Sequence, residues 1–434
     1  MAAIDQHLLK VRSPVDGKEI PYHVSAPNPL PTSPIPLVFL LHDTLADPSS
    51  SAFIELAFQT ASNWSSALAM GPTALLVQPW GRGNAGWLGP AGRALFDVWN
   101  QLEDQFLLPD SAALFGVGAG GCGAIQLAAQ FPERFRAVSA VNPWTDERLC
   151  LPFGIDDHPV WETDARRSVR PINLALKLAG KSIVLASVPV GDALSALAAK
   201  RHFACFVESL EKSGVEWHDF SVEAHPLFDT PPSLDLPRIL RNLVESSNAG
   251  RSPDREKLSM PPSMFWRSLS IVVGTLGETS EIDAMRRLAE RIRDRWLSGE
   301  DSCNLAPRDR RLHQEIPIIV DSDAVAESPA GDLVVLGSPR LNLLAARWAD
   351  RLAVSWPSNE SDAFVLLGQA FSNPEAFAVA SGSRPDGEDG RVWIVAAGSE
   401  AAWIDVDRVR FAFLSDVFIE SKPDEILWMN HERG

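Results

Sequence analysis

The sequence predicts an α/β protein, in which a domain with a mostly parallel sheet covered by helices is followed by a smaller α/β domain. Short, continuous apolar runs recur along the first half of the chain, as expected for strands buried on both faces of a parallel sheet. Helical segments separate these runs. A polar stretch that contains a proline, 246–254, then breaks the pattern, and a strand followed by a helix starts it again.

The first domain is expected to cover residues 1–248. Its strands are predicted at 37–41, 74–77, 112–115, 137–141, 183–186 and 216–220. The chain has 434 residues, more than the roughly 250–300 that one core usually serves. We therefore place a linker at 249–264 and a second domain at 265–434.

The second domain repeats the strand-then-helix pattern on a smaller scale. Its strands are predicted at 270–273, 316–320, 333–336, 363–367 and 392–396, with the last strands antiparallel. A helix is predicted between the first two strands. Its apolar residues Ile282, Met285, Ala289, Ile292 and Trp296 recur at three- and four-residue steps, which places them on one helical face.

The composition is that of an ordinary soluble globular chain, with 45% apolar and 22% charged residues. The net charge of −17 repels phosphate backbones and anionic lipids, so we expect neither nucleic acid nor membranes as partners. The first residues lack the pattern of a secretory signal, and the cysteines Cys122, Cys150, Cys205 and Cys303 show no metal or disulfide spacing. A cytoplasmic protein without metal or cofactor is expected.

The most informative segment is 110–124, where a strand runs into a glycine-rich turn and a helix follows at once. This arrangement is typical of a nucleophile elbow, G-x-S-x-G, in which a serine stands at the tip of a strained turn. The two flanking glycines are present as Gly116 and Gly120. Gly118 takes the place of the serine, so the nucleophile position is vacant.

Together with its surroundings, this segment resembles the esterase and prolyl-oligopeptidase-like branch of the α/β-hydrolase superfamily. The helix and turn at 127–135 and the glycines at 81–83 support the likeness, which extends over about 15–245. The resemblance implies Asp192 as the acid and His225 as the base of a catalytic triad. An aspartate in a loop is also a common turn former, and this reading of Asp192 stays open.

The loop expected to form the oxyanion hole departs from the family as well. The family has a glycine after the histidine here, but His42 is followed by Asp43, whose carboxylate opposes the stabilisation of negative charge. We expect a structural role for His42. The remaining cleft candidates are Ala119, which follows the vacant position, and Trp80, whose indole either lines the cleft or belongs to the core.

Two other groups are candidates to replace the missing serine as the nucleophile. The thiol of Cys122 lies one helical turn past the corner, where it is either a nucleophile or a small buried apolar group. A water molecule activated by His225 is the second route.

In the second domain, the glycine turns at 274–277 and 337–342 lack the full G-x-G-x-x-G spacing and the P-loop lysine, so a nucleotide site is not expected. They are read as tight strand-to-helix turns, in an arrangement that resembles the accessory domain of some bacterial esterase-like proteins.

These observations favour a relative of serine esterases and peptidases that has lost acyl transfer and binds a small molecule or a protein. The alternative is an active ester or peptide hydrolase with a substituted nucleophile. A third hypothesis is a homo-oligomeric scaffold held together by the second domain.

Overall fold

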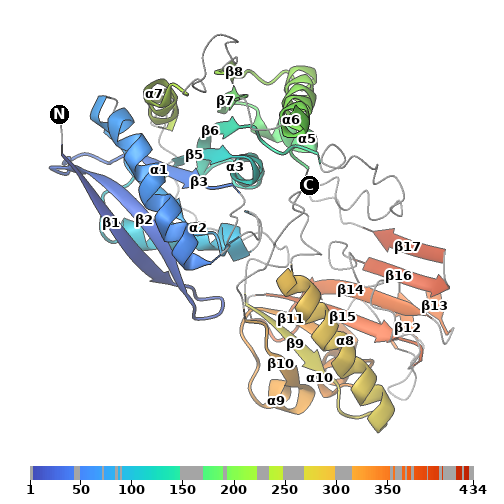
Figure 1. Cartoon of the computed structure of the whole chain (residues 1–434). Coiled ribbons are helices and arrows are strands. Elements are labelled where there is room, and N and C mark those ends of the chain that lie inside the picture. The colour runs from blue at the N-terminus through green and yellow to red at the C-terminus, as the bar shows by residue number, and fades with distance from the viewer. Residues whose placement is uncertain are drawn as a thin grey trace. The chain divides into compact units, whose positions relative to one another are not determined.

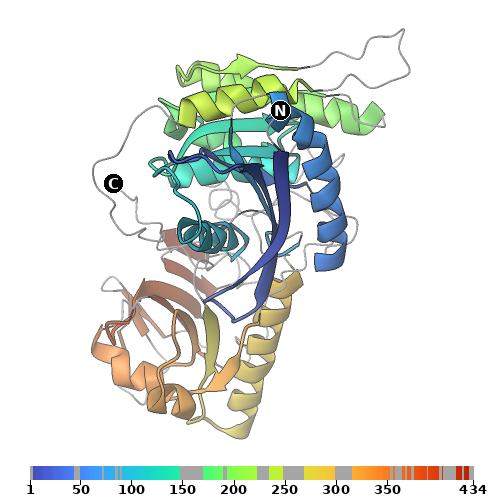
Figure 2. The same cartoon turned by 90° about the vertical axis from the view of Figure 1, so that its left-hand side faces the viewer.

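The computed structural model describes residues 3–43, 49–70, 73–83, 87, 90–146, 170–188, 193–221, 234–247, 268–298, 315–351, 355–356, 364–366, 369–372, 376–388, 390–399, 403, 417–422 and 425–429. The chain divides into two compact units, one mostly before Ser259 and the other mostly after Met260. Each unit carries its own sheet (Figures 1 and 2). The linker placed at 249–264 lies outside the described residues.

Unit 1 is built on an eight-stranded sheet in the order β1-β2-β4-β3-β5-β6-β7-β8. Its strands are β1 (Ala3–Arg12), β2 (Glu19–Asn28), β3 (Leu37–Leu41), β4 (Leu75–Pro79), β5 (Ala112–Val117), β6 (Phe135–Val141), β7 (Ser182–Ala186) and β8 (His218–Asp219). All neighbours from β4 to β8 are parallel, whereas β2 pairs antiparallel with both β1 and β4. The mostly parallel sheet is confirmed, and β8 is shorter than the expected strand at 216–220.

Helices cover both faces of this sheet (Figure 1). They are α1 (Ser50–Met70), α2 (Pro90–Glu103), α3 (Ala119–Gln130), α5 (Pro171–Leu174), α6 (Ala193–Lys212) and α7 (Leu236–Ser247). Val38 and Leu40 of β3 join a buried cluster with residues of α1 and α7. Phe39, between them, contacts Trp99 of α2. Because successive side chains of a strand point to opposite faces, α1 and α7 cover one face and α2 lies on the other.

Unit 2 contains a seven-stranded sheet in the order β10-β9-β11-β15-β14-β16-β17. Its strands are β9 (Leu269–Val273), β10 (Ile318–Val320), β11 (Asp332–Leu336), β14 (Phe377–Ser383), β15 (Arg391–Ala397), β16 (Val417–Lys422) and β17 (Glu425–Met429), and its helices are α8 (Thr279–Ser298), α9 (Asp321–Ala326) and α10 (Leu343–Trp348). The four strands from β10 to β15 are parallel, and the pairings that join β15, β14, β16 and β17 are antiparallel.

The antiparallel last strands of unit 2 are confirmed, and one strand expectation needs correction. The strand expected at 392–396 is β15, which is antiparallel to β14 and, on its other side, parallel to β11. The strand expected at 363–367 is β12 (Phe364–Leu366), which pairs with β13 (Gln369–Phe371) in a separate two-stranded sheet. Its apolar residues resemble those of a sheet strand, but Phe364 packs in a cluster of its own with Ala376, Ala378 and neighbouring residues.

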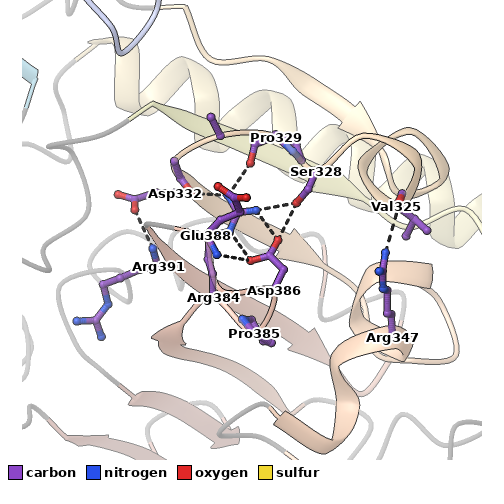
Figure 3. A network of polar contacts seen from close by, with 12 residues as sticks. Val325, Ser328, Pro329, Asp332, Arg347, Arg384, Pro385, Asp386, Glu388 and Arg391 are labelled. Atoms are coloured by element: carbon purple, nitrogen blue, oxygen red, sulfur yellow. Dashed lines mark hydrogen bonds and ion pairs between the residues drawn. The ribbon is translucent and has the colours of Figure 1, made fainter.

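A buried arginine fixes the turn between β14 and β15 (Figure 3). The Arg384 guanidinium donates to the carbonyl oxygens of Pro329 and Gly331 at 2.5 and 2.7 Å and to the Asp386 carboxylate at 2.6 Å. Burial acts to raise the pKa of Asp386, but the hydrogen bonds from Arg384 and Ser328 outweigh it and lower that pKa to about 2. The turn is thereby joined to the loop that leads into β11.

Candidate active site at the corner between β5 and α3

Gly118 lies at the corner where β5 ends and α3 begins, as the glycine pattern predicts. Its dihedral angles are φ 53° and ψ −114°, a combination that side-chain-bearing residues rarely adopt. Its N–H donates to the Val141 carbonyl at 2.9 Å, and its own carbonyl accepts from the Cys122 N–H at 3.0 Å. The corner is therefore hydrogen-bonded to β6 on one side and to the first turn of α3 on the other.

The flanking glycines are required by close backbone contacts. A β-carbon on Gly116 would overlap the backbone of Gly120, and a β-carbon on Gly120 would overlap the carbonyl oxygen of Leu41. Both contacts involve backbone atoms, which cannot move aside as a flexible side chain can. The G-x-G-x-G pattern thus follows from the packing of β3, β5 and α3.

The carboxyl group of Asp43 occupies the space next to Gly118. A β-carbon on Gly118 would overlap all three atoms of this carboxyl group. Its Oδ1 accepts a hydrogen bond from the backbone N–H of Ala119 at 2.8 Å, and the residue is partly exposed. The N–H after the nucleophile is the one that holds the oxyanion in hydrolases with this elbow. In this chain the corresponding N–H, that of Ala119, donates its hydrogen bond to the Asp43 carboxylate.

His42 connects the loop after β3 to the end of β4. Its Nδ1 lies 2.6 Å from the Asp43 carbonyl oxygen, and its Nε2 lies 2.8 Å from the Trp80 carbonyl oxygen. Burial lowers the pKa of His42, against the raising effect of these two carbonyls. With both ring nitrogens engaged by backbone, the imidazole positions Asp43.

The two tryptophans near the corner are packed into the protein. Trp87 is 2% exposed, donates its indole N–H to the His42 carbonyl at 3.3 Å and covers Gly81, where a β-carbon would come within 2.7 Å of its ring. Trp80 belongs to a buried cluster with Ile20, Phe53, Ala57 and Ala94. Both indoles contribute to the core beside the corner.

Of the remaining catalytic candidates, only Cys122 lies within the described residues. Cys122 is 3% exposed within α3. Asp192 and His225 lie outside the described residues. The described segments that precede these two residues are joined by hydrogen bonds. The Phe220 N–H donates to the Leu185 carbonyl at 2.8 Å, and the Ser187 N–H donates to the Ser221 hydroxyl at 2.9 Å.

Asn142 is a site residue that the sequence reasoning missed. It follows β6 with a φ of 44°. Its Nδ2 donates to the Val188 carbonyl at 3.0 Å, and its Oδ1 accepts from the Val188 N–H at 3.0 Å. This pair of bonds holds the chain after β7. An asparagine directly after a buried strand and before Pro143 is the signal that could have indicated it.

The glycine turns of unit 2 are closed by a buried carboxylate. Asp321 accepts from the N–H groups of Thr275 and Leu343 at 3.2 and 2.6 Å and from the Thr275 hydroxyl at 2.6 Å. Asn342 caps α10 by accepting from the N–H groups of Leu344 and Ala345. The hydrogen bonds of these two residues stabilise the turns and the start of α10.

Within the described residues, no group of three or more His, Cys, Asp and Glu side chains could hold a metal ion. None of the described helices combines the length and the apolar character that crossing a membrane requires.

No family model matches the chain, and the search of curated proteins gives no match. Solved structures similar to part of it include a thermostable esterase, with 15% identity, a TM-score of 0.40 and 55% of this chain covered. The match spans 60% of that esterase's own length. S-formylglutathione hydrolase (FrmB) from Staphylococcus aureus has 14% identity and a TM-score of 0.39 over 57% of this chain and 98% of that one.

The acylaminoacyl peptidase of Pyrococcus horikoshii has 13% identity and a TM-score of 0.38, over 51% of this chain and 37% of that one. Unit 1 has the mostly parallel sheet covered by helices that the sequence predicts, with a sharp corner between β5 and α3.

Proposed function

We propose that unit 1 has lost serine-type acyl transfer and acts by binding a ligand, either a small molecule or a protein. One observation supports this proposal above the others: the Asp43 carboxyl group stands against the vacant position at Gly118 and accepts the Ala119 N–H. Acyl transfer needs a nucleophile at this corner and a donor for the developing oxyanion. The same carboxylate interferes with both requirements.

The two departures from the hydrolase pattern depend on each other. With any side chain at position 118, the Asp43 carboxyl group could not keep its place. With its present hydrogen bond, the carboxylate puts negative charge where a substrate carbonyl oxygen would become negative. Loss of an oxyanion-hole donor alone costs about 2.7–4 kcal/mol in the transition state, and a like charge adds to that cost.

The test compares the parent chain with two variants, using a fluorophosphonate probe and p-nitrophenyl butyrate. We expect neither labelling nor ester hydrolysis by the parent. Gly118→Ser alone should also stay inactive, because its β-carbon overlaps Asp43. The double variant Gly118→Ser with Asp43→Gly should gain labelling and hydrolysis, provided that Asp192 and His225 hold the places that the resemblance implies.

Robust ester hydrolysis by the parent chain would overturn the proposal in favour of a hydrolase with a substituted nucleophile. Cys122→Ala and His225→Ala would then show which group carries the reaction. Cys205→Ala is the matched control for the thiol, since Cys205 lies in α6, outside the corner.

A further inference from the structure

Lys181 joins the connection between α3 and β6 to the start of β7. Its Nζ donates to the carbonyl oxygens of Pro132 and Phe135, each at 2.6 Å, and the residue directly precedes β7. Lys181 is half-buried. We propose that Lys181 is a modification site, at which a small acyl phosphate transfers its acyl group to the amine that these two carbonyls hold.

The two hydrogen bonds determine the direction from which the amine can attack. A lysine ammonium has three N–H donors, and two of them donate to Pro132 and Phe135. The third points away from both carbonyl oxygens, because the four bonds of the nitrogen are tetrahedral. Loss of this third proton breaks neither hydrogen bond and leaves a lone pair in the same direction. Holding the amine in this orientation removes part of the entropic barrier to its attack.

The surroundings of Lys181 raise the share of the neutral amine, which is the form that attacks an acyl carbon. Burial lowers the pKa of Lys181 to about 8, with the carboxylate of Glu133 acting to raise it and the guanidinium of Arg136 acting to lower it further. About half of the amine is therefore neutral at pH 8. A lysine with the ordinary pKa of 10.5 has about 0.3% of its amine in this form at the same pH.

The reaction needs only the acyl phosphate. The lone pair of Nζ forms a bond to the acyl carbon, and the bond between that carbon and the phosphate oxygen breaks. Phosphate leaves with the bonding electron pair, and the nitrogen gives one proton to solvent. The product is an uncharged amide of Lys181 with a single N–H. One of the two carbonyls, that of Pro132 or that of Phe135, thereby loses its donor, and the connection after α3 is held less firmly to β7.

The modification site is separate from the corner at Gly118. The strands β5, β6 and β7 are parallel neighbours, so their amino ends lie together and their carboxyl ends lie together at the opposite end of the sheet. Lys181 precedes β7, whereas Gly118 follows β5. The inference therefore goes beyond the proposed function and does not depend on it.

The test treats the full chain with acetyl phosphate near pH 8 and follows acetylation by mass spectrometry of proteolytic peptides. We expect Lys181 to be acetylated at least about tenfold faster than the exposed Lys177, since the lower basicity of its amine offsets only part of the gain in neutral form. The preference should disappear in urea, where the two carbonyls no longer hold the amine. The rate at Lys181 should level off above about pH 8.

Lys181→Arg keeps a cation that can donate to both carbonyls and should lose only the acetylation at position 181. Lys177→Arg, the matched control, should leave the acetylation of Lys181 unchanged. After treatment, hydrogen exchange at 131–136 should rise in the parent chain but not in Lys181→Arg. Acetylation of Lys181 no faster than that of Lys177, the same preference in urea, or unchanged exchange at 131–136 in the chain acetylated at Lys181 would each overturn the inference.

Discussion

Gly118→Ser is expected to destabilise unit 1 by about 2.5–6 kcal/mol, as the sum of two costs. A side chain at φ 53° and ψ −114° costs about 1–3 kcal/mol. The new β-carbon also overlaps the Asp43 carboxyl group, so that side chain must rotate away from the Ala119 N–H. A hydrogen bond to a charged group contributes about 1.5–3 kcal/mol.

A double-mutant cycle separates these two costs. In an Asp43→Gly background the overlap is absent, so Gly118→Ser should cost only the backbone part, about 1–3 kcal/mol. Gly214→Ser is the matched control for the backbone part. Its φ is 65°, and no heavy atom beyond its chain neighbours lies within 4 Å of an added β-carbon. The coupling between positions 43 and 118 should therefore be about 1.5–3 kcal/mol.

The assay is urea unfolding of the full chain, with hydrogen-exchange mass spectrometry of the peptides around α3 to assign the transition to unit 1. If Gly118→Ser costs the same with and without the Asp43 carboxyl group, the reasoning is refuted. A cost no larger than that of Gly214→Ser would have the same meaning, because it would leave no room for the overlap.

Three further predictions concern other buried polar groups. Arg384→Met should destabilise unit 2 by about 3–5 kcal/mol, since it removes the buried donor that two carbonyl groups and Asp386 share; faster hydrogen exchange at 328–331 would show it. His202 accepts from the N–H groups of Thr145 and Asp146, and burial lowers its pKa to about 4. Stability present above pH 6.5 should therefore be lost as the pH falls toward 4, by up to about 3 kcal/mol; His202→Asn should flatten urea midpoints measured over this range, and an unchanged slope would contradict the assignment. Asn142→Ala should cost about 2–4 kcal/mol, from a φ of 44° and two lost bonds to Val188, whereas Asn142→Gly should cost less; equal urea midpoints for the two variants would count against the backbone contribution.

The corner at Gly118 could be predicted from the sequence because a strand-to-helix corner of this kind has a recognisable glycine pattern. Gly116 and Gly120 are needed where β-carbons would meet backbone atoms a few residues away or on the adjacent strand. The position of the Asp43 carboxyl group could not be predicted in the same way. Its hydrogen bond to Ala119 joins residues 76 positions apart, and it depends on how the loop after β3 is held by His42.

The amino-terminal hairpin shows a second limit of sequence reasoning. Apolar runs indicate strands that are buried on both faces, and β3 to β7 were found by this signal. β1 has a mixed sequence and is largely exposed at the edge of the sheet, so it carries no such run. Asn342 illustrates the opposite case: the sequence placed it at the end of the turn at 337–342, and its role as the cap of α10 became clear only from the hydrogen bonds.

The dihedral angles at Gly118 have a consequence for how durable this corner is. Glycine adopts a positive φ with little steric penalty, whereas a serine with the same dihedral angles would be strained. In this chain the bend between β5 and α3 therefore costs unit 1 almost no stability. A bend without strain can be retained when it supports no catalysis, and the space beside it can then be filled by another group, here the Asp43 carboxyl group.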